Sequence, residues 1–169
     1  MRNIYLILFL FIAGLINTGS SCKLSMSGAS IPPEIESVTI NYFPNQSPFV
    51  ATSLSQIFTE TLIDKFNRES NLTVKDTGGD WEFNGAVTNY TSTPIAPTGN
   101  ETTALNRLTI VVKVEFTDLK DETRNWTQSF SRFSDYESTQ VLSQVENDLI
   151  QEISEQLADD IFLNVAGNW

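Results

Sequence analysis

The sequence predicts an α+β fold, a two-layer sandwich in which two helices cover one face of a four-stranded mixed sheet, in the order β-α-β-β-β-α. Two periodicities support this prediction. Apolar and polar residues alternate in four segments, as in half-buried strands, and apolar residues recur every three or four positions in two longer segments, as in amphipathic helices. A strand–helix–strand start implies a crossover between parallel strands, so we expect the sheet to be mixed.

The first strand and the first helix are predicted within residues 34–68. Ile35, Val38, Ile40 and Tyr42 indicate a short strand, with Thr39 and Asn41 on its other face. Ser47 and Pro48 are typical of a helix start, with the serine as N-cap and the proline at the first helical position. The apolar face of this helix then comprises Val50, Leu54, Ile57, Phe58, Leu62 and Phe66.

The second strand is predicted at residues 81–88, where Trp81, Phe83 and Val87 alternate with polar residues. The connection before it, residues 71–80, contains a brief extended piece at residues 72–74 and a glycine turn.

Residues 90–101 are predicted to form a long loop, because Pro94, Pro97 and Gly99 interrupt the pattern. Ile95 lies at the apolar tip of this loop. Unstructured loops of about twelve residues or more are often functional, so Pro94, Ile95 and Pro97 are candidate partner contacts. The alternative is an ordinary connection between two strands.

The third and fourth strands are predicted at residues 105–116 and 126–133, joined by a charged turn. The third strand alternates cleanly, with Leu108 and Val112 on the apolar face. The opposite face of the sheet is expected to carry Arg107, Lys113, Gln128 and Arg132. Its three cations are candidate contacts for lipid phosphates or for carboxylates of a partner, and the alternative is that they are merely solvated.

The last and longest helix is predicted to begin at a capping box, residues 134–137 with the sequence Ser-Asp-Tyr-Glu. An apolar stripe follows at steps of four: Val141, Val145, Leu149, Ile153, Leu157, Ile161 and Val165. Packing on the sheet explains this stripe better than a coiled-coil seam, which alternates steps of three and four.

Cys22, the only cysteine, follows a hydrophobic leader. The apolar run at residues 4–16 is shorter than the roughly 20 residues of a membrane-spanning helix, so residues 1–21 are predicted to be an export signal. The small residues before Cys22 are similar to a bacterial lipobox, in which the cysteine is acylated and becomes the mature N-terminus. The alternative is a plain secretory peptide that leaves Cys22 as a free thiol.

The chain is therefore divided into a lipoprotein signal peptide (1–21), a lipidated N-terminus and polar tether (22–33), and a single domain (34–169). A lipid on Cys22, such as palmitate, would hold the domain at a membrane without a transmembrane helix.

The composition excludes several classes of function. The formal net charge is −11, and it becomes −12 once Arg2 leaves with the leader, which argues against nucleic-acid binding. Histidine is absent, so the commonest general base and the commonest metal ligand are both missing. The paired carboxylates lie in a predicted turn or on a solvated helix face. We expect no enzyme activity, no metal and no cofactor.

Four short motifs resemble one known family: residues 27–35 (SGASIPPEI), 42–45 (YFPN), 106–110 (NRLTI) and the closing Asn168-Trp169. With the lipobox and in this order, they are similar to the Bacteroidota branch of the LptE family of lipopolysaccharide-assembly lipoproteins. The resemblance covers the chain from Cys22 to Trp169 and implies a two-helix, four-strand domain.

The resemblance also implies a function, namely to plug the outer-membrane β-barrel LptD and to help deliver lipopolysaccharide to the outer leaflet. Residues 23–30 lack the acidic run that resembles a surface-export tag in this phylum, so the protein should stay in the outer membrane and face the periplasm. The alternative is a periplasm-facing lipoprotein that binds a small apolar ligand or serves another barrel machine.

The lipobox generates the first prediction. Cys22→Ser should leave the domain folded but unanchored, because a flexible tether separates the anchor from the first strand. The protein should move from the membrane to the soluble fraction and should no longer incorporate radiolabelled palmitate. Continued labelling of the variant would show that Cys22 is not the acylated residue.

Overall fold

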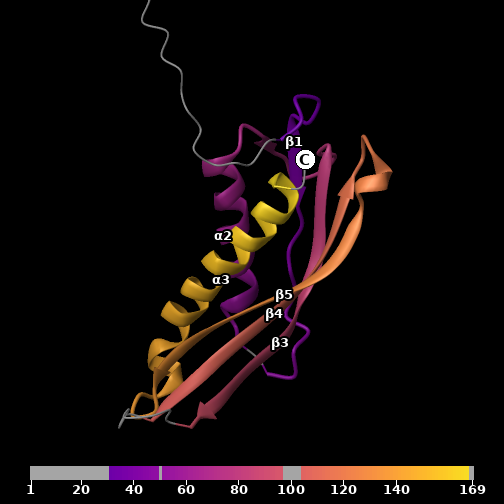
Figure 1. The fold of residues 1–169 in the computed structure, drawn as a ribbon. Helices are drawn as coiled ribbons and strands as arrows, with labels where there is room; N and C mark the ends of the chain where they lie inside the picture. The colour runs from indigo at the N-terminus through magenta and orange to yellow at the C-terminus, as the bar shows by residue number, and fades with distance from the viewer. Residues whose placement is uncertain (1–30, 50, 97–103, 168–169) are drawn as a thin grey trace, which may run out of the picture.

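The computed structural model describes residues 31–49, 51–96 and 104–167. In this part of the chain, two helices pack side by side on one face of an open sheet (Figure 1). The helices are α2 (Leu54–Glu69) and α3 (Leu142–Ala166), and the strands are β1 (Ser37–Ile40), β2 (Thr73–Val74), β3 (Trp81–Ile95), β4 (Leu105–Asp118) and β5 (Trp126–Glu137). A short 3-10 helix, η1 (Glu122–Arg124), precedes β5. The predicted α+β class is confirmed.

The sheet has the strand order β2-β1-β3-β4-β5. β1 runs parallel to both β2 and β3, whereas β3, β4 and β5 are antiparallel, so the expected mixed sheet is confirmed. The predicted number of four strands is wrong, because the extended piece at residues 72–74 forms the edge strand β2. Two residues are too few for an alternation pattern to be recognised in a sequence.

The predicted loop over residues 90–101 is also wrong in its first half. β3 continues to Ile95, and Pro94 and Ile95 pair with Asn106 and Leu105 of β4. A proline fits here because β1 reaches only Phe83, so β3 has no strand neighbour on its other side at Pro94. Pro97 lies outside the described residues.

The first helix begins later than predicted, at Leu54 with Ser53 as its N-cap residue. Ser47 lies instead in a turn, where its backbone N–H and its hydroxyl both donate to Asn45 Oδ1, at 2.9 and 2.6 Å. This side-chain bond competes with a helical conformation at Ser47. Asn45 is held in place in turn, since its segment forms a bridge with Val87 of β3.

The prediction of a capping box at residues 134–137 is wrong, because these residues form the end of β5. Their side chains have partners elsewhere: Ser134 donates to Glu152, Asp135 pairs with Arg107, and Tyr136 shares a hydrogen bond with Ser92. The helix therefore starts at Leu142. Its predicted apolar stripe is confirmed as a core surface from Leu149 onward.

The core fills the space between the helices and the sheet. The predicted apolar face of β4 is buried along its whole length: Leu108, Ile110, Val112, Val114 and Phe116. Phe66 of α2 joins the two layers, since its ring centroid lies 5.1 Å from that of Phe83 in β3 and 5.2 Å from that of Phe162 in α3. At the end of β4, the fully buried Asp118 accepts a hydrogen bond from the Trp81 indole at 3.1 Å.

The aromatic contact between the layers generates the second prediction. Phe66→Ala should lower the free energy of unfolding by about 3–5 kcal/mol, because it leaves a cavity between α2, α3 and the sheet. The same substitution at Phe49, which is 60% exposed, should cost far less. Chemical denaturation of both variants measures the difference, and equal losses would contradict the assignment of Phe66 as a core contact.

Candidate functional site

Two surfaces of the domain are candidates for function. The first is the open face, defined as the side of β3, β4 and β5 that is turned away from the helices. Its side chains alternate with the buried ones and are mostly small and polar: Asn89, Thr91, Thr93, Arg107, Thr109, Val111, Lys113, Ser129, Ser131 and Phe133. Thr91 lies directly opposite Thr109 across the β3–β4 pair. The open face also carries charged side chains of both signs, since Glu82, Glu115 and Asp135 lie on it beside Arg107 and Lys113.

Of the three cations predicted for this face, Arg107 and Lys113 lie on it, and both are ion-paired. Arg107 donates from Nε and Nη2 to the two carboxylate oxygens of Asp135, at 2.7 and 2.8 Å, and its guanidinium lies 3.6 Å from the centroid of the Phe133 ring. This partner lowers the pKa of Asp135 below its ordinary value. Lys113 Nζ lies 3.0 Å from Glu115 Oε1.

Arg132 is placed on the wrong face by the sequence prediction. It lies on the helix side of β5, next in the alternation to the buried Phe130, and makes a bidentate contact with Asp160 of α3. Gln128 lies on the same side and accepts from Asn164. Both residues are exposed and reach polar side chains of α3, so their polarity is compatible with the helix side of an edge strand.

The excess of acidic residues neutralises other basic side chains as well. Lys65 pairs with Glu69 and Asp159 at 2.6 Å each, and Lys120 pairs with Asp80. A phosphate that binds any of these cations must displace a carboxylate that already neutralises it.

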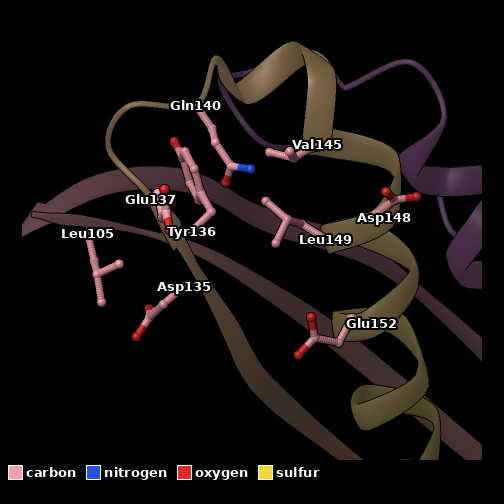
Figure 2. Close-up of a pocket in the computed structure, with 9 residues that line it drawn as sticks. All are labelled: Leu105, Asp135, Tyr136, Glu137, Gln140, Val145, Asp148, Leu149 and Glu152. Carbon is pink, nitrogen blue, oxygen red and sulfur yellow. The ribbon is translucent and has the colours of Figure 1, made fainter. Parts of the chain in front are cut away.

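The second surface is the α3–β5 groove, which lies between the end of β5 and the N-terminal half of α3 (Figure 2). It has a volume of about 380 Å³. Its lining residues are Leu105, Asp135, Tyr136, Glu137, Gln140, Val145, Asp148, Leu149 and Glu152. Figure 2 shows Val145 and Leu149 on the helix opposite Tyr136 on the strand, with carboxylates around them.

Contacts around the groove hold its walls together. The Tyr136 hydroxyl lies 2.7 Å from Ser92 Oγ, and Glu152 accepts from Ser134 at 2.9 Å. Beside the groove, the Tyr90 hydroxyl donates to Glu146 of α3. Burial and the Glu146 carboxylate raise the pKa of Tyr90 above its ordinary value of 10.0. These bonds tie β3 and β5 to the start of α3.

The α3–β5 groove was not predicted from the sequence. Its only sequence signal is that Asp148 and Glu152, one helical turn apart, border the apolar positions Val145 and Leu149. The strand wall could not be foreseen, because residues 134–137 were assigned to the helix start. Cys22 and Pro97 lie outside the described residues, and Pro94 and Ile95 belong to β3 rather than to a loop.

Neither a metal centre nor a membrane-spanning helix is found among the described residues. No group of three or more His, Cys, Asp or Glu residues there is arranged to hold a metal ion. No helix in the same part of the chain has both the length and the hydrophobicity to cross a membrane.

Comparison with known proteins gave one family match. The model of the LptE family, described as lipopolysaccharide-assembly, matches residues 35–165. No curated protein matches the sequence significantly.

Several solved structures are similar in fold. A minor lipoprotein from Acinetobacter baumannii is 13% identical, with a TM-score of 0.54 over 80% of this chain and 95% of that one. A protein from Xanthomonas campestris is 10% identical, with a TM-score of 0.55 over 82% and 90% of the two chains. The rare lipoprotein B from Shewanella oneidensis is 14% identical, with a TM-score of 0.49 over 76% and 94%. The first two similarities show a shared fold.

The bond between Tyr90 and Glu146 generates the third prediction. A phenol whose pKa is raised by folding contributes stability below the unfolded pKa of about 10 and loses it as the pH rises through the folded pKa. The melting temperature should therefore fall above pH 10, and Tyr90→Phe should reduce that fall. Tyr42→Phe, at a site that is 61% exposed, is the control and should leave the pH profile of melting unchanged.

Proposed function

The chain belongs to the LptE family, and on this premise we propose that it is an outer-membrane lipoprotein that plugs and helps assemble a large β-barrel of the LptD kind. In that complex it assists the delivery of lipopolysaccharide to the outer leaflet. The observation that carries the proposal is the family match, which extends from before β1 to near the end of α3. At the family level, the role of the chain lies in lipopolysaccharide assembly.

The open face supports a role as a plug. The interior of an outer-membrane barrel is polar, so a domain that occupies it needs a surface without a large apolar patch. Three long strands present such a surface, with Thr91, Thr109, Ser129 and Ser131 among its side chains. The opposite face is already covered by α2 and α3, which leaves the open face for the barrel wall (Figure 1).

The anchor belongs to the same proposal. Residues 1–21 act as the signal peptide, Cys22 carries the lipid, and residues 22–33 tether the domain 34–169 to the inner leaflet of the outer membrane. β1 begins at Ser37, so the tether would join the domain close to its first strand. A short tether raises the effective concentration of the domain at the barrel.

The ion pairs favour structural plugging over strong binding of lipid phosphate. Arg107 and Lys113 are the cations of the open face, and each is already neutralised by a carboxylate. We propose that they contact barrel carboxylates or lipid phosphates only by exchanging these partners. A small apolar ligand is a less suitable alternative, because the α3–β5 groove is bordered by carboxylates.

The fourth prediction tests this function. A tagged full-length protein, extracted from its own cells with detergent, should co-purify with a very large outer-membrane β-barrel, and its depletion should leave that barrel unassembled. Purification without any barrel, while membranes and detergent extraction are intact, would contradict the proposal.

The same purification tests the two cations. Arg107→Gln with Lys113→Gln should reduce recovery of the barrel or of bound lipopolysaccharide by a few-fold, since each removes one exposed charge. Arg68→Gln with Lys75→Gln makes the same change of charge away from the open face and should have no effect. Equal recovery in both double variants would show that the two residues are only solvated strand charges.

A further inference from the structure

The strand β5 ends the sheet with a long free edge. It is last in the strand order, and among the described residues its only strand partner is β4. Twelve residues, Trp126–Glu137, form this edge without a proline, a lysine or a register shift toward β4, and its inward-facing charge, Arg132, is paired with Asp160. Natural proteins usually protect such edges with these features, because unpaired N–H and C=O groups template pairing with another strand.

The α3–β5 groove lies alongside this free edge. Asp135, Tyr136 and Glu137 of β5 form one wall, and Val145, Asp148, Leu149 and Glu152 of α3 form the other (Figure 2). Side chains of an added strand project alternately to the two faces of a sheet. Every second side chain of a strand placed on the β5 edge would therefore point toward α3 and the groove.

The chemistry of the groove specifies one kind of side chain. Val145 and Leu149 offer an apolar wall, whereas Glu137 and Asp148 are exposed carboxylates. No lysine or arginine is among the lining residues. A lysine or arginine from another chain can lay its aliphatic stem on the apolar wall and direct its charged end to the carboxylates. Lipid phosphates are repelled by the same carboxylates.

We propose that an extended segment of a partner protein pairs with the free edge of β5 and inserts a lysine or arginine side chain into the α3–β5 groove. Main-chain hydrogen bonds to the edge supply affinity, and the groove selects the basic residue. The inference rests on the proposed function for the identity of the partner, which is the outer-membrane barrel. It deepens that function by assigning the contact surface and its chemistry.

Hydrogen exchange separates this inference from the proposed function. Amide exchange is measured by mass spectrometry on the free protein and on the purified complex with the barrel. Strand addition predicts at least about tenfold slower exchange for amides of residues 126–137 in the complex, because the outward N–H groups gain hydrogen bonds. A complex in which these amides exchange at unchanged rates overturns the inference and leaves the proposed function standing. Absence of any complex overturns both.

Substitutions that change the charge of the groove test whether a basic side chain of the partner binds there. Glu137→Lys with Asp148→Lys should reduce recovery of the barrel by about tenfold, because the incoming cation then meets two like charges. Asp64→Lys with Asp76→Lys is the matched control, since both residues are exposed and lie away from the groove, and recovery should be unchanged. Equal recovery in the two variants overturns the inference.

A neutral variant guards against misfolding of the lysine variant. Glu137→Gln with Asp148→Asn keeps the size of both side chains and removes their charge. It should fold with a normal melting temperature and still lose barrel recovery, by a smaller factor than the lysine variant. Full recovery of the barrel with the neutral variant would show that the two carboxylates do not select a basic side chain of the partner.

Discussion

The burial of the β4 apolar face is the constraint on which the rest of the structure depends. Its five alternating residues from Leu108 to Phe116 are at most 4% exposed, and only helices on that side of the sheet can cover them. α2 and α3 therefore share one side, and the polar side chains of β3, β4 and β5 share the other. Both candidate surfaces follow from this division. The open face is the uncovered side, and the groove forms where α3 meets the end of β5.

The distribution of charge determines the electrostatic potential of the surface. A formal charge of −11 does not leave its basic residues free, since Arg107, Arg132 and Lys65 each bind at least one carboxylate. Exposed ion pairs of this kind contribute little to stability and are easily exchanged. Their main effect is to remove positive potential from the surface. The domain is therefore better suited to protein contacts and to basic segments than to anionic lipid.

The regular elements could be predicted from the sequence, and the element ends could not. Alternation identified β4 correctly because its apolar positions face the core throughout, whereas β5 was located only in part, since Phe133 is exposed and the strand continues to Glu137. The boundaries of helices and strands were predicted wrongly where a residue distant in the sequence determines the local conformation. Asn45 holds Ser47 in a turn, Arg107 holds Asp135 in a strand, and a missing neighbour strand allows Pro94 to remain in β3. None of these partners has a fixed sequence separation, so the groove they help to build was equally unpredictable.

The place of β1 in the sheet affects how a newly made chain folds. β1 precedes both of its partners, β2 and β3, and Asp80 accepts hydrogen bonds from the backbone N–H groups of Glu36 and Ser37 across sequence separations of 44 and 43 residues. During synthesis the first strand has no strand partner until α2 and β2 have emerged, and its longer pairing requires the start of β3 as well. Contacts of such long range form slowly. The segment at β1 therefore remains without its full set of partners until the chain as far as β3 has been made.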